Sequence, residues 1–195
     1  MSAHSHKAIG VLDSGVGGLT VVREIQRQLP HEGIVYFGDT ARMPYGPRPY
    51  EEVRRFALEI IDFLKSQDIK MVVVACNSAT AAGITHYQKE CPFPVLGVIE
   101  PGVRAAIAQT RNNKVGVIGT AGTINSSEYK KTLLREKADL QVFEKACPLF
   151  VLLVENNLVD TPEALLVAEE YLQPLKRAGI DTLILGCTHY PLMAH

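Results

Sequence analysis

The sequence feature that most constrains the fold is a short apolar run, Met-Val-Val-Val at residues 71–74, which leads into Ala75, Cys76, Asn77 and Ser78. Apolar and mainly β-branched residues in a run of this length are typical of a strand that is buried on both faces of a sheet. The small residues that come next predict the start of a helix. Ligands of open α/β sheets lie beyond the carboxyl ends of the strands, beside the N-termini of the following helices. Cys76 is therefore placed for chemistry.

A second copy of this arrangement lies near the end of the sequence. Residues 182–186 (Thr-Leu-Ile-Leu-Gly) form another apolar run, and Cys187, Thr188 and His189 follow it. The sequence thus presents two thiols, each at the predicted end of a strand and each followed by small or polar residues. Any account of function has to explain both.

Two further segments resemble one another. GVLDSG at residues 10–15 has the form of GVIGTAG at residues 116–122. Together with the two cysteine segments, this echo predicts two similar α/β units rather than one continuous domain. We place the boundary near Glu100, with a first domain over residues 1–99 and a second over residues 100–195.

The composition is that of an ordinary globular protein. Of the 195 residues, 47% are hydrophobic and 21% are charged, and the net charge is −1. No basic stripe favours nucleic acid, no long apolar run favours a membrane span, and the first residues lack the apolar core of a signal peptide, so we expect a cytoplasmic protein. Four cysteines without a CxxC pair give little support to a zinc site or any other metal site. We interpret Cys91 and Cys147 as small buried hydrophobes.

The order of predicted elements indicates the fold class. Strands are expected over residues 8–12, 34–37, 71–74, 95–99, 114–119, 140–143 and 182–186. Helices are expected over residues 19–28 and 50–65, from the Cys76 turn to about 90, over 149–156 and 162–176, and opening at 100–102 and after 119–123. This alternation predicts a doubly wound, mostly parallel α/β architecture.

The turn after the first strand is rich in glycine and begins with Asp13 and Ser14. Its glycines allow the backbone to approach a small ligand, but their spacing does not match the dinucleotide fingerprint, and Asp13 would repel a pyrophosphate. Local sequence leaves Asp13 open as a helix cap or as a catalytic group.

Two other segments carry candidate site residues. Tyr45 and Gly46 lie in a loop dense in proline and glycine, where they form either a ligand contact through a hydroxyl and a backbone N–H or simply a rigid turn. Glu155 ends an otherwise apolar stretch. Local sequence favours a helix-end charge there over a perturbed acid.

Two opposed thiols suggest a specific reaction. A thiolate on one side of a carbon can remove a proton while a thiol on the other side returns one, which inverts the stereocentre. Asn77, Ser78 and Thr188 suit hydrogen bonds to a substrate carboxylate. His189 either assists the Cys187 thiol or is a structural histidine.

Four motifs in order, DSGVGG, MPYG, VVVACNSAT and GCTHYP, resemble the glutamate racemase family of the aspartate/glutamate racemase superfamily. The resemblance runs from Ala8 to Leu192. It implies two α/β domains that face each other across an active-site cleft, and racemisation of glutamate without a cofactor. It also implies D-glutamate supply for peptidoglycan, and so for the cell wall and cell shape, and a possible homodimer.

The resemblance also assigns roles to residues. It implies that Cys76 and Cys187 are the two catalytic acid/bases, one for each enantiomer, assisted by Asp13, Glu155 and His189. It implies substrate binding by Asp13, Ser14, Tyr45, Gly46, Asn77, Ser78, Thr188 and His189, with Thr120 and Thr123 nearby.

The sequence departs from the family pattern at three places. Ser78 stands where the family commonly has threonine, Leu152 replaces a common proline, and the family continues several dozen residues past GCTHYP to complete the first domain. Alternative hypotheses are a two-cysteine racemase of the aspartate or hydantoin type, an inactive truncated binding module, and a thiol redox protein, which requires the two thiols close enough to bond.

Overall fold

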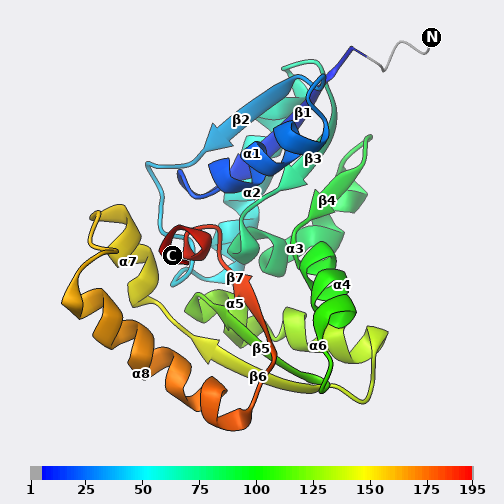
Figure 1. Cartoon of the computed structure of the whole chain (residues 1–195). Helices are drawn as coiled ribbons and strands as arrows, with labels where there is room; N and C mark the ends of the chain where they lie inside the picture. The colour runs from blue at the N-terminus through cyan, green and yellow to red at the C-terminus, as the bar shows by residue number, and fades with distance from the viewer. Residues whose placement is uncertain (1–5, 195) are drawn as a thin grey trace. The chain divides into compact units, whose positions relative to one another are not determined.

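The computed structural model describes residues 6–194, and the chain divides between Val98 and Ile99 into two compact units. Each unit is built on its own parallel sheet with helices between the strands, as Figure 1 shows. The predicted doubly wound α/β class is confirmed. The division into domains is a separate prediction about how the whole protein is organised, and it stays a prediction.

The first unit has a four-stranded sheet in the order β2-β1-β3-β4. Its strands are β1 (Ala8–Asp13), β2 (Ile34–Gly38), β3 (Ile69–Val74) and β4 (Val95–Gly97). Its helices are α1 (Leu19–Gln28), α2 (Tyr50–Lys65) and α3 (Asn77–Glu90). All strand pairs are parallel.

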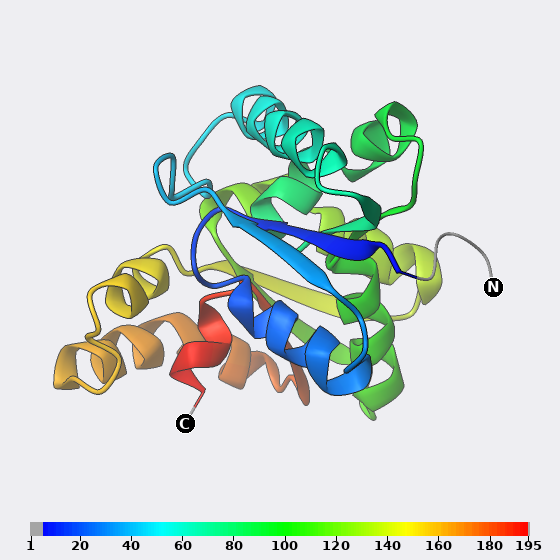
Figure 2. The ribbon, with the colours of Figure 1, turned by 90° about the horizontal axis from the view of Figure 1, so that it is seen from above.

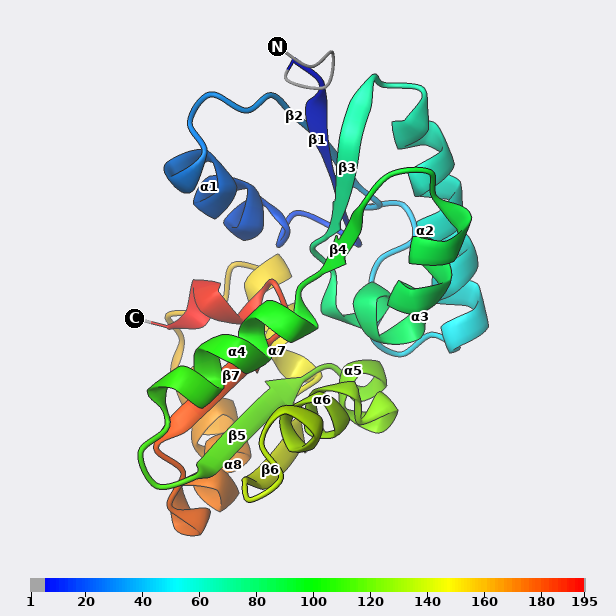
Figure 3. The same ribbon diagram turned by 90° about the vertical axis from the view of Figure 1, so that its right-hand side faces the viewer.

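The two faces of this sheet are covered unequally. Figures 2 and 3 show α1 on one face, with α2 and α3 on the other. Val72 and Val74 of β3 point into a large core with α2 and α3, whereas Met71 and Val73 pack on the α1 side, which explains the unbroken apolar run. Every side chain of α1 stays at least partly exposed, and Leu19 is 49% exposed. The α1 face is thinly covered.

The second unit has a three-stranded parallel sheet in the order β6-β5-β7. Its strands are β5 (Lys114–Gly119), β6 (Gln141–Ala146) and β7 (Thr182–Gly186). Its helices are α4 (Ile99–Gln109), α5 (Ala121–Ser126), α6 (Glu128–Glu136), α7 (Leu149–Glu155) and α8 (Pro162–Ala178), with a short 3₁₀ helix, η1 (Tyr190–Met193). In its core, Phe150 packs edge-on against Tyr171 and Tyr190, with ring centroids 5.3 and 5.2 Å apart.

The similarity between the two halves of the sequence corresponds to a shared strand order. In both units the first strand lies between the second and the third, as β2-β1-β3 and as β6-β5-β7. The chain direction across the sheet reverses between the first and third strands, and such a switch point is where doubly wound sheets bind their ligands. Cys76 follows β3 and Cys187 follows β7, so each thiol lies at the switch point of its own sheet.

Several strand boundaries differ from the prediction, since β3 begins at Ile69 and not at residue 71, and β6 spans Gln141–Ala146 and not residues 140–143. The strand expected over residues 95–99 ends at Gly97, and Ile99 begins α4. A Cβ atom at Gly97 would lie 2.4 Å from Thr80 Cγ2, so β4 and α3 approach too closely for any larger residue. The helix expected after the β5 turn is also divided, because Ser127 adopts a left-handed φ of 55° between α5 and α6.

Candidate functional site

Cys76 lies at the carboxyl end of β3, where it is the N-cap residue of α3. Its Sγ accepts the N–H of Ala79 at 3.4 Å and lies 3.7 Å from Ser14 Oγ. The residue is 4% exposed. A sulfur in the N-cap position faces the partial positive charge of the helix N-terminus, which favours a thiolate. The Cys76 thiol thus lies between the N-terminus of α3 and the Ser14 hydroxyl of the loop after β1.

Opposing influences act on the Cys76 thiol. Burial raises the pKa of Cys76 to about 12, and the negative charge of Asp13 adds to the rise. The N–H of Ala79 and the hydroxyl and N–H of Ser14 act in the other direction. Burial is the largest of these influences, and it favours the protonated thiol. In that state it can give a proton to a carbanion.

Asp13 closes the turn between β1 and α1. Its fully buried carboxylate accepts the N–H of Gly15 at 3.1 Å and the N–H of Gly18 at 3.0 Å through the same oxygen, Oδ2. A Cβ atom at Gly18 would lie 2.5 Å from the Cβ of Asp13, so this turn requires glycine there. Asp13 thus holds the turn that leads into α1, whose N-cap is Gly18, and the same carboxylate lies near enough to raise the pKa of Cys76. Its catalytic role stays a prediction.

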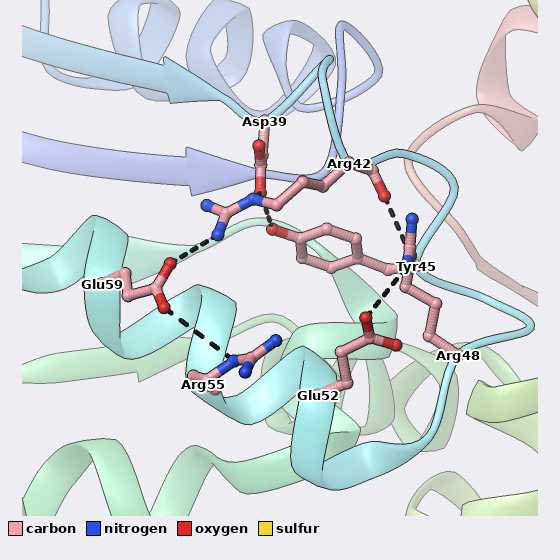
Figure 4. Close-up of polar contacts among 7 residues, drawn as sticks. All are labelled: Asp39, Arg42, Tyr45, Arg48, Glu52, Arg55 and Glu59. Atoms are coloured by element: carbon pink, nitrogen blue, oxygen red, sulfur yellow. Dashed lines mark hydrogen bonds and ion pairs between the residues drawn. The ribbon is translucent and has the colours of Figure 1, made fainter.

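Tyr45 is held inside its loop by its hydroxyl. Figure 4 shows this hydroxyl directed at Asp39, to whose carboxylate it donates, and Arg42 donates to the same oxygen from Nε at 2.6 Å. Tyr45 is 2% exposed, and burial together with Asp39 raises the pKa of its phenol. The hydroxyl thus has a partner within the protein. Ligand binding by Tyr45 and Gly46 stays a prediction.

The small polar residues around Cys76 share its edge of the sheet. Ser14 follows β1, and Asn77 and Ser78 form the first turn of α3. All of them are buried. Their contacts with a substrate stay predicted.

Cys187 has a different set of neighbours. Its Sγ lies 3.7 Å from Nδ1 of His189, and Nε2 of that ring lies 2.5 Å from Oε1 of Glu155, at the end of α7. His189 is 3% exposed, whereas the Glu155 side chain is 23% exposed. The structure therefore joins Cys187, His189 and Glu155 into a thiol–imidazole–carboxylate row.

The direction of proton movement along this row follows from its geometry. A carboxylate accepts only, so Glu155 fixes the ring proton of a neutral His189 on Nε2. Nδ1 then carries the lone pair and faces the thiol. His189 can accept the proton of Cys187 and return it later, which is the arrangement of a base-activated cysteine.

The remaining predicted residues of the second unit lie in turns at strand ends. Thr120 follows β5 and caps α5, since its Oγ1 accepts the N–H of Thr123 at 3.3 Å. The hydroxyls of Thr120 and Thr123 are 3.1 Å apart. Thr188 follows Cys187, and like Thr120 and Thr123 it is buried. Thr120 and Thr188 flank the switch point of this sheet, since they follow its first and third strands.

Sequence reasoning missed Asp39. It is 5% exposed and follows β2, and the bonds from Tyr45 and Arg42 both end on it. A usable signal was present, because an acidic residue directly after a predicted buried strand, ahead of a loop rich in proline and glycine, is seldom free of a partner.

The described residues, 6–194, contain neither a cluster of metal ligands nor a membrane-spanning helix. No group of three or more His, Cys, Asp and Glu side chains in that range is arranged to hold a metal ion. Within the same residues, no helix is both long enough and apolar enough to cross a membrane.

Comparison with known proteins gives consistent results. Over 188 residues the chain is 57% identical to a protein named glutamate racemase from Oceanobacillus iheyensis, a match covering 96% of this chain and 69% of that relative. The crystal structure of a glutamate racemase isoform from Bacillus anthracis superposes with a TM-score of 0.95 at 53% identity, over 98% of this chain and 72% of that one. A glutamate racemase from Francisella tularensis in complex with D-glutamate gives 0.91 at 39% identity, over 97% and 71%.

A family model agrees with these matches. The model described as Asp/Glu/Hydantoin racemase matches residues 9–195. The match covers both sheets and both cysteine-bearing strand ends. The chain therefore belongs to the Asp/Glu/Hydantoin racemase family, and it is an isomerase.

Proposed function

We propose that this protein interconverts L- and D-glutamate by two-base proton transfer at Cα, with Cys76 and Cys187 as the two bases. The observation that carries the proposal is that each sheet presents one thiol at its switch point, just beyond the end of its third strand. The choice of glutamate is supported by relatives of that name, including the Francisella tularensis protein solved with D-glutamate.

The local surroundings support complementary roles for the two thiols. Cys187 passes its proton to Nδ1 of His189 and so becomes a thiolate that removes the Cα proton from one face of the substrate. Cys76, protonated at rest, gives its proton to the other face of the resulting carbanion. The opposite enantiomer is converted with the two roles exchanged, which requires a Cys76 thiolate stabilised by the N–H of Ala79.

Binding of the substrate carboxylate falls to neutral donors. Ser14, Asn77 and Ser78 of the first unit, and Thr188 of the second, offer hydroxyl, amide and backbone groups at the ends of the strands. A buried carboxylate is tolerated only when donors of this kind satisfy its oxygens. We assign the substrate carboxylates to these groups, with Tyr45 and Gly46 beside them.

The remaining parts of the proposal concern the cell. The two thiols carry both proton transfers in this scheme, and we propose that the reaction needs no cofactor. We also propose that the D-glutamate formed enters peptidoglycan.

The test is racemisation of L-glutamate in D₂O by the 195-residue chain, followed by circular dichroism and by loss of the α-proton NMR signal. A two-base enzyme places deuterium in the product enantiomer and little in the recovered substrate, whereas a one-base enzyme labels both. Cys76→Ser and Cys187→Ser should each reduce turnover by about 10²-fold or more. Cys91→Ser is the matched control, because Cys91 is only half-buried at the far end of α3, and it should keep full activity.

Outcomes that contradict the proposal are equally specific. Loss of activity in only one cysteine variant would leave a one-base mechanism. A folded, reduced chain that neither inverts nor exchanges glutamate, but inverts aspartate or a hydantoin, would reassign the substrate within the family.

A further inference from the structure

Asp39 lies between two of the candidate site residues and contacts both. Its backbone N–H donates to the carbonyl of Asp13 at 3.0 Å, which extends the pairing of β1 and β2 by one residue. Its carboxylate accepts the hydroxyl of Tyr45. Asp39 is therefore the link between the strand end beside Cys76 and the loop that carries Tyr45 and Gly46.

The buried charge of Asp39 is balanced by Arg42. Arg42 Nε donates to Asp39 Oδ2 at 2.6 Å, and its Nη1 donates to Glu59 Oε2 on α2 at 2.5 Å. The guanidinium lies 4.2 Å from the centre of the Phe56 ring. Figure 4 shows Arg42 lying between the two carboxylates. This arrangement ties the start of the loop to the end of β2 and to the surface of α2.

The far side of the loop is held as well. Arg48 donates from Nε to the carbonyl of Arg42 at 3.0 Å and from Nη1 to Glu52 at 3.0 Å. Its backbone N–H donates to the carbonyl of Tyr45 at 3.0 Å. The backbone at Tyr45 and Gly46 is thus fixed from both ends, with Asp39 as the one buried charge in the group.

We infer that Asp39 is a positioning residue, which acts through Tyr45 and Arg42 to hold Tyr45 and Gly46 where substrate binds. The inference rests on the proposed function. It assigns to Asp39 no contact with the substrate. Loops that carry binding groups gain precision when side chains of the rigid elements fix them, and a displacement near 1 Å can weaken binding strongly.

The kinetic test is Asp39→Asn. Asparagine keeps an oxygen for the Tyr45 hydroxyl but removes the charge that holds Arg42, so the loop loosens without a cavity. Because the loop binds substrate and transition state alike, we expect KM for glutamate to rise about tenfold while kcat changes by less than about threefold. Asp62→Asn is the matched control. It breaks an exposed ion pair between Asp62 and Lys65, both on α2, and its KM should equal that of the wild type.

A second measurement reads the loop without using activity. Trypsin cleaves after arginine except before proline, so within the loop the Arg42–Met43 bond is open to it and the Arg48–Pro49 bond is not. Cleavage at Arg42 should be several-fold faster in Asp39→Asn than in the wild type or in Asp62→Asn, at an unchanged melting temperature.

The outcomes separate this inference from the proposed function. Unchanged KM and unchanged cleavage in Asp39→Asn would overturn the positioning role, as would a fall in kcat at constant KM, which marks loss of folded enzyme. A wild-type chain inactive on glutamate would overturn the proposed function, and faster cleavage in Asp39→Asn would then still support Asp39 as the residue that fixes this loop.

Discussion

The thiol of Cys76 is surrounded by backbone N–H groups and a buried carboxylate, whereas the thiol of Cys187 faces an imidazole that is itself bound to a carboxylate. Both occupy the same place in sheets of the same strand order. Topology thus determines where each thiol lies, and residues from other segments determine what surrounds it. A helix end and a buried carboxylate lie beside the thiol of the first unit, and an imidazole lies beside the thiol of the second.

The two thiols differ most in their contact with His189, which lies beside Cys187. His189→Asn removes the proton acceptor of Cys187, and we expect kcat/KM to fall by about 10²-fold at pH 7 with either enantiomer. The deficit should shrink as the pH rises, because hydroxide then ionises the thiol without help from the imidazole.

A pH–rate profile of each variant checks this expectation. His86→Asn alters an exposed histidine of α3 and should leave the profile unchanged. A deficit of equal size at every pH would show that His189 acts through structure alone.

A substitution at Gly18 tests how closely the turn packs against Asp13 in the first unit. Gly18→Ala adds a Cβ atom 2.5 Å from Asp13 Cβ and 2.8 Å from the Tyr36 hydroxyl. Such crowding in a packed site costs about 2–3 kcal/mol of unfolding free energy, measured by urea titration. Gly33→Ala is the control, since its nearest neighbour would be at an ordinary 3.6 Å. Equal stabilities for the two variants would contradict the close approach.

The negative charge of Asp13 acts on the thiol of Cys76. Asp13→Asn removes a negative charge near Cys76, so the thiolate becomes easier to form, and the pKa of Cys76 should fall by about one unit from about 12. The rate of Cys76 alkylation as a function of pH reports this value. Alkylation of Cys187 in the same protein is the internal control, and parallel shifts at both thiols would refute a local effect of Asp13.

Glu144 of β6, a partly buried carboxylate of the second unit, gives the smallest expected effect. In residues 6–194 its buried Oε1 has no hydrogen-bond partner, and burial raises the pKa of its carboxyl. A raised pKa in the folded state means that the folded protein favours the neutral carboxyl. Ionisation therefore destabilises the folded state once the pH passes above the pKa of the unfolded state, and this destabilisation is absent in acid.

Glu144→Gln should therefore raise the unfolding free energy at pH 7 by about 1 kcal/mol, allowing for its partial exposure, and by little at pH 4. Urea titrations at the two pH values measure the difference. Glu136→Gln, on the exposed side of α6, should leave the unfolding free energy unchanged at both pH values. A gain of the same size at both pH values would show that ionisation of Glu144 is not the cause.

Much of the fold could be predicted from local sequence. Strands such as β5 and β7 and helices such as α2 have the bounds expected from apolar periodicity, because their burial follows a regular repeat. The place of both thiols followed from the same patterns. These features depend on neighbours within one element.

Contacts between distant segments could not be predicted. Glu155 and His189 are far apart in sequence, and no local pattern shows that a helix end will bring a carboxylate to that ring. The bonds that converge on Asp39 and the close approach at Gly97 likewise depend on how loops pack after the sheet has formed. Periodicity carries no information about such pairings.

The unequal surroundings of the two thiols have a thermodynamic consequence for the proposed racemisation. L- and D-glutamate have equal free energy in water, so the equilibrium constant is one and kcat/KM must be the same in both directions. The different surroundings of Cys76 and Cys187 therefore cannot favour one product at equilibrium. They can only give the two enantiomers different kcat and KM values in the same ratio, so that the enantiomer bound more tightly is also the one converted more slowly at saturation.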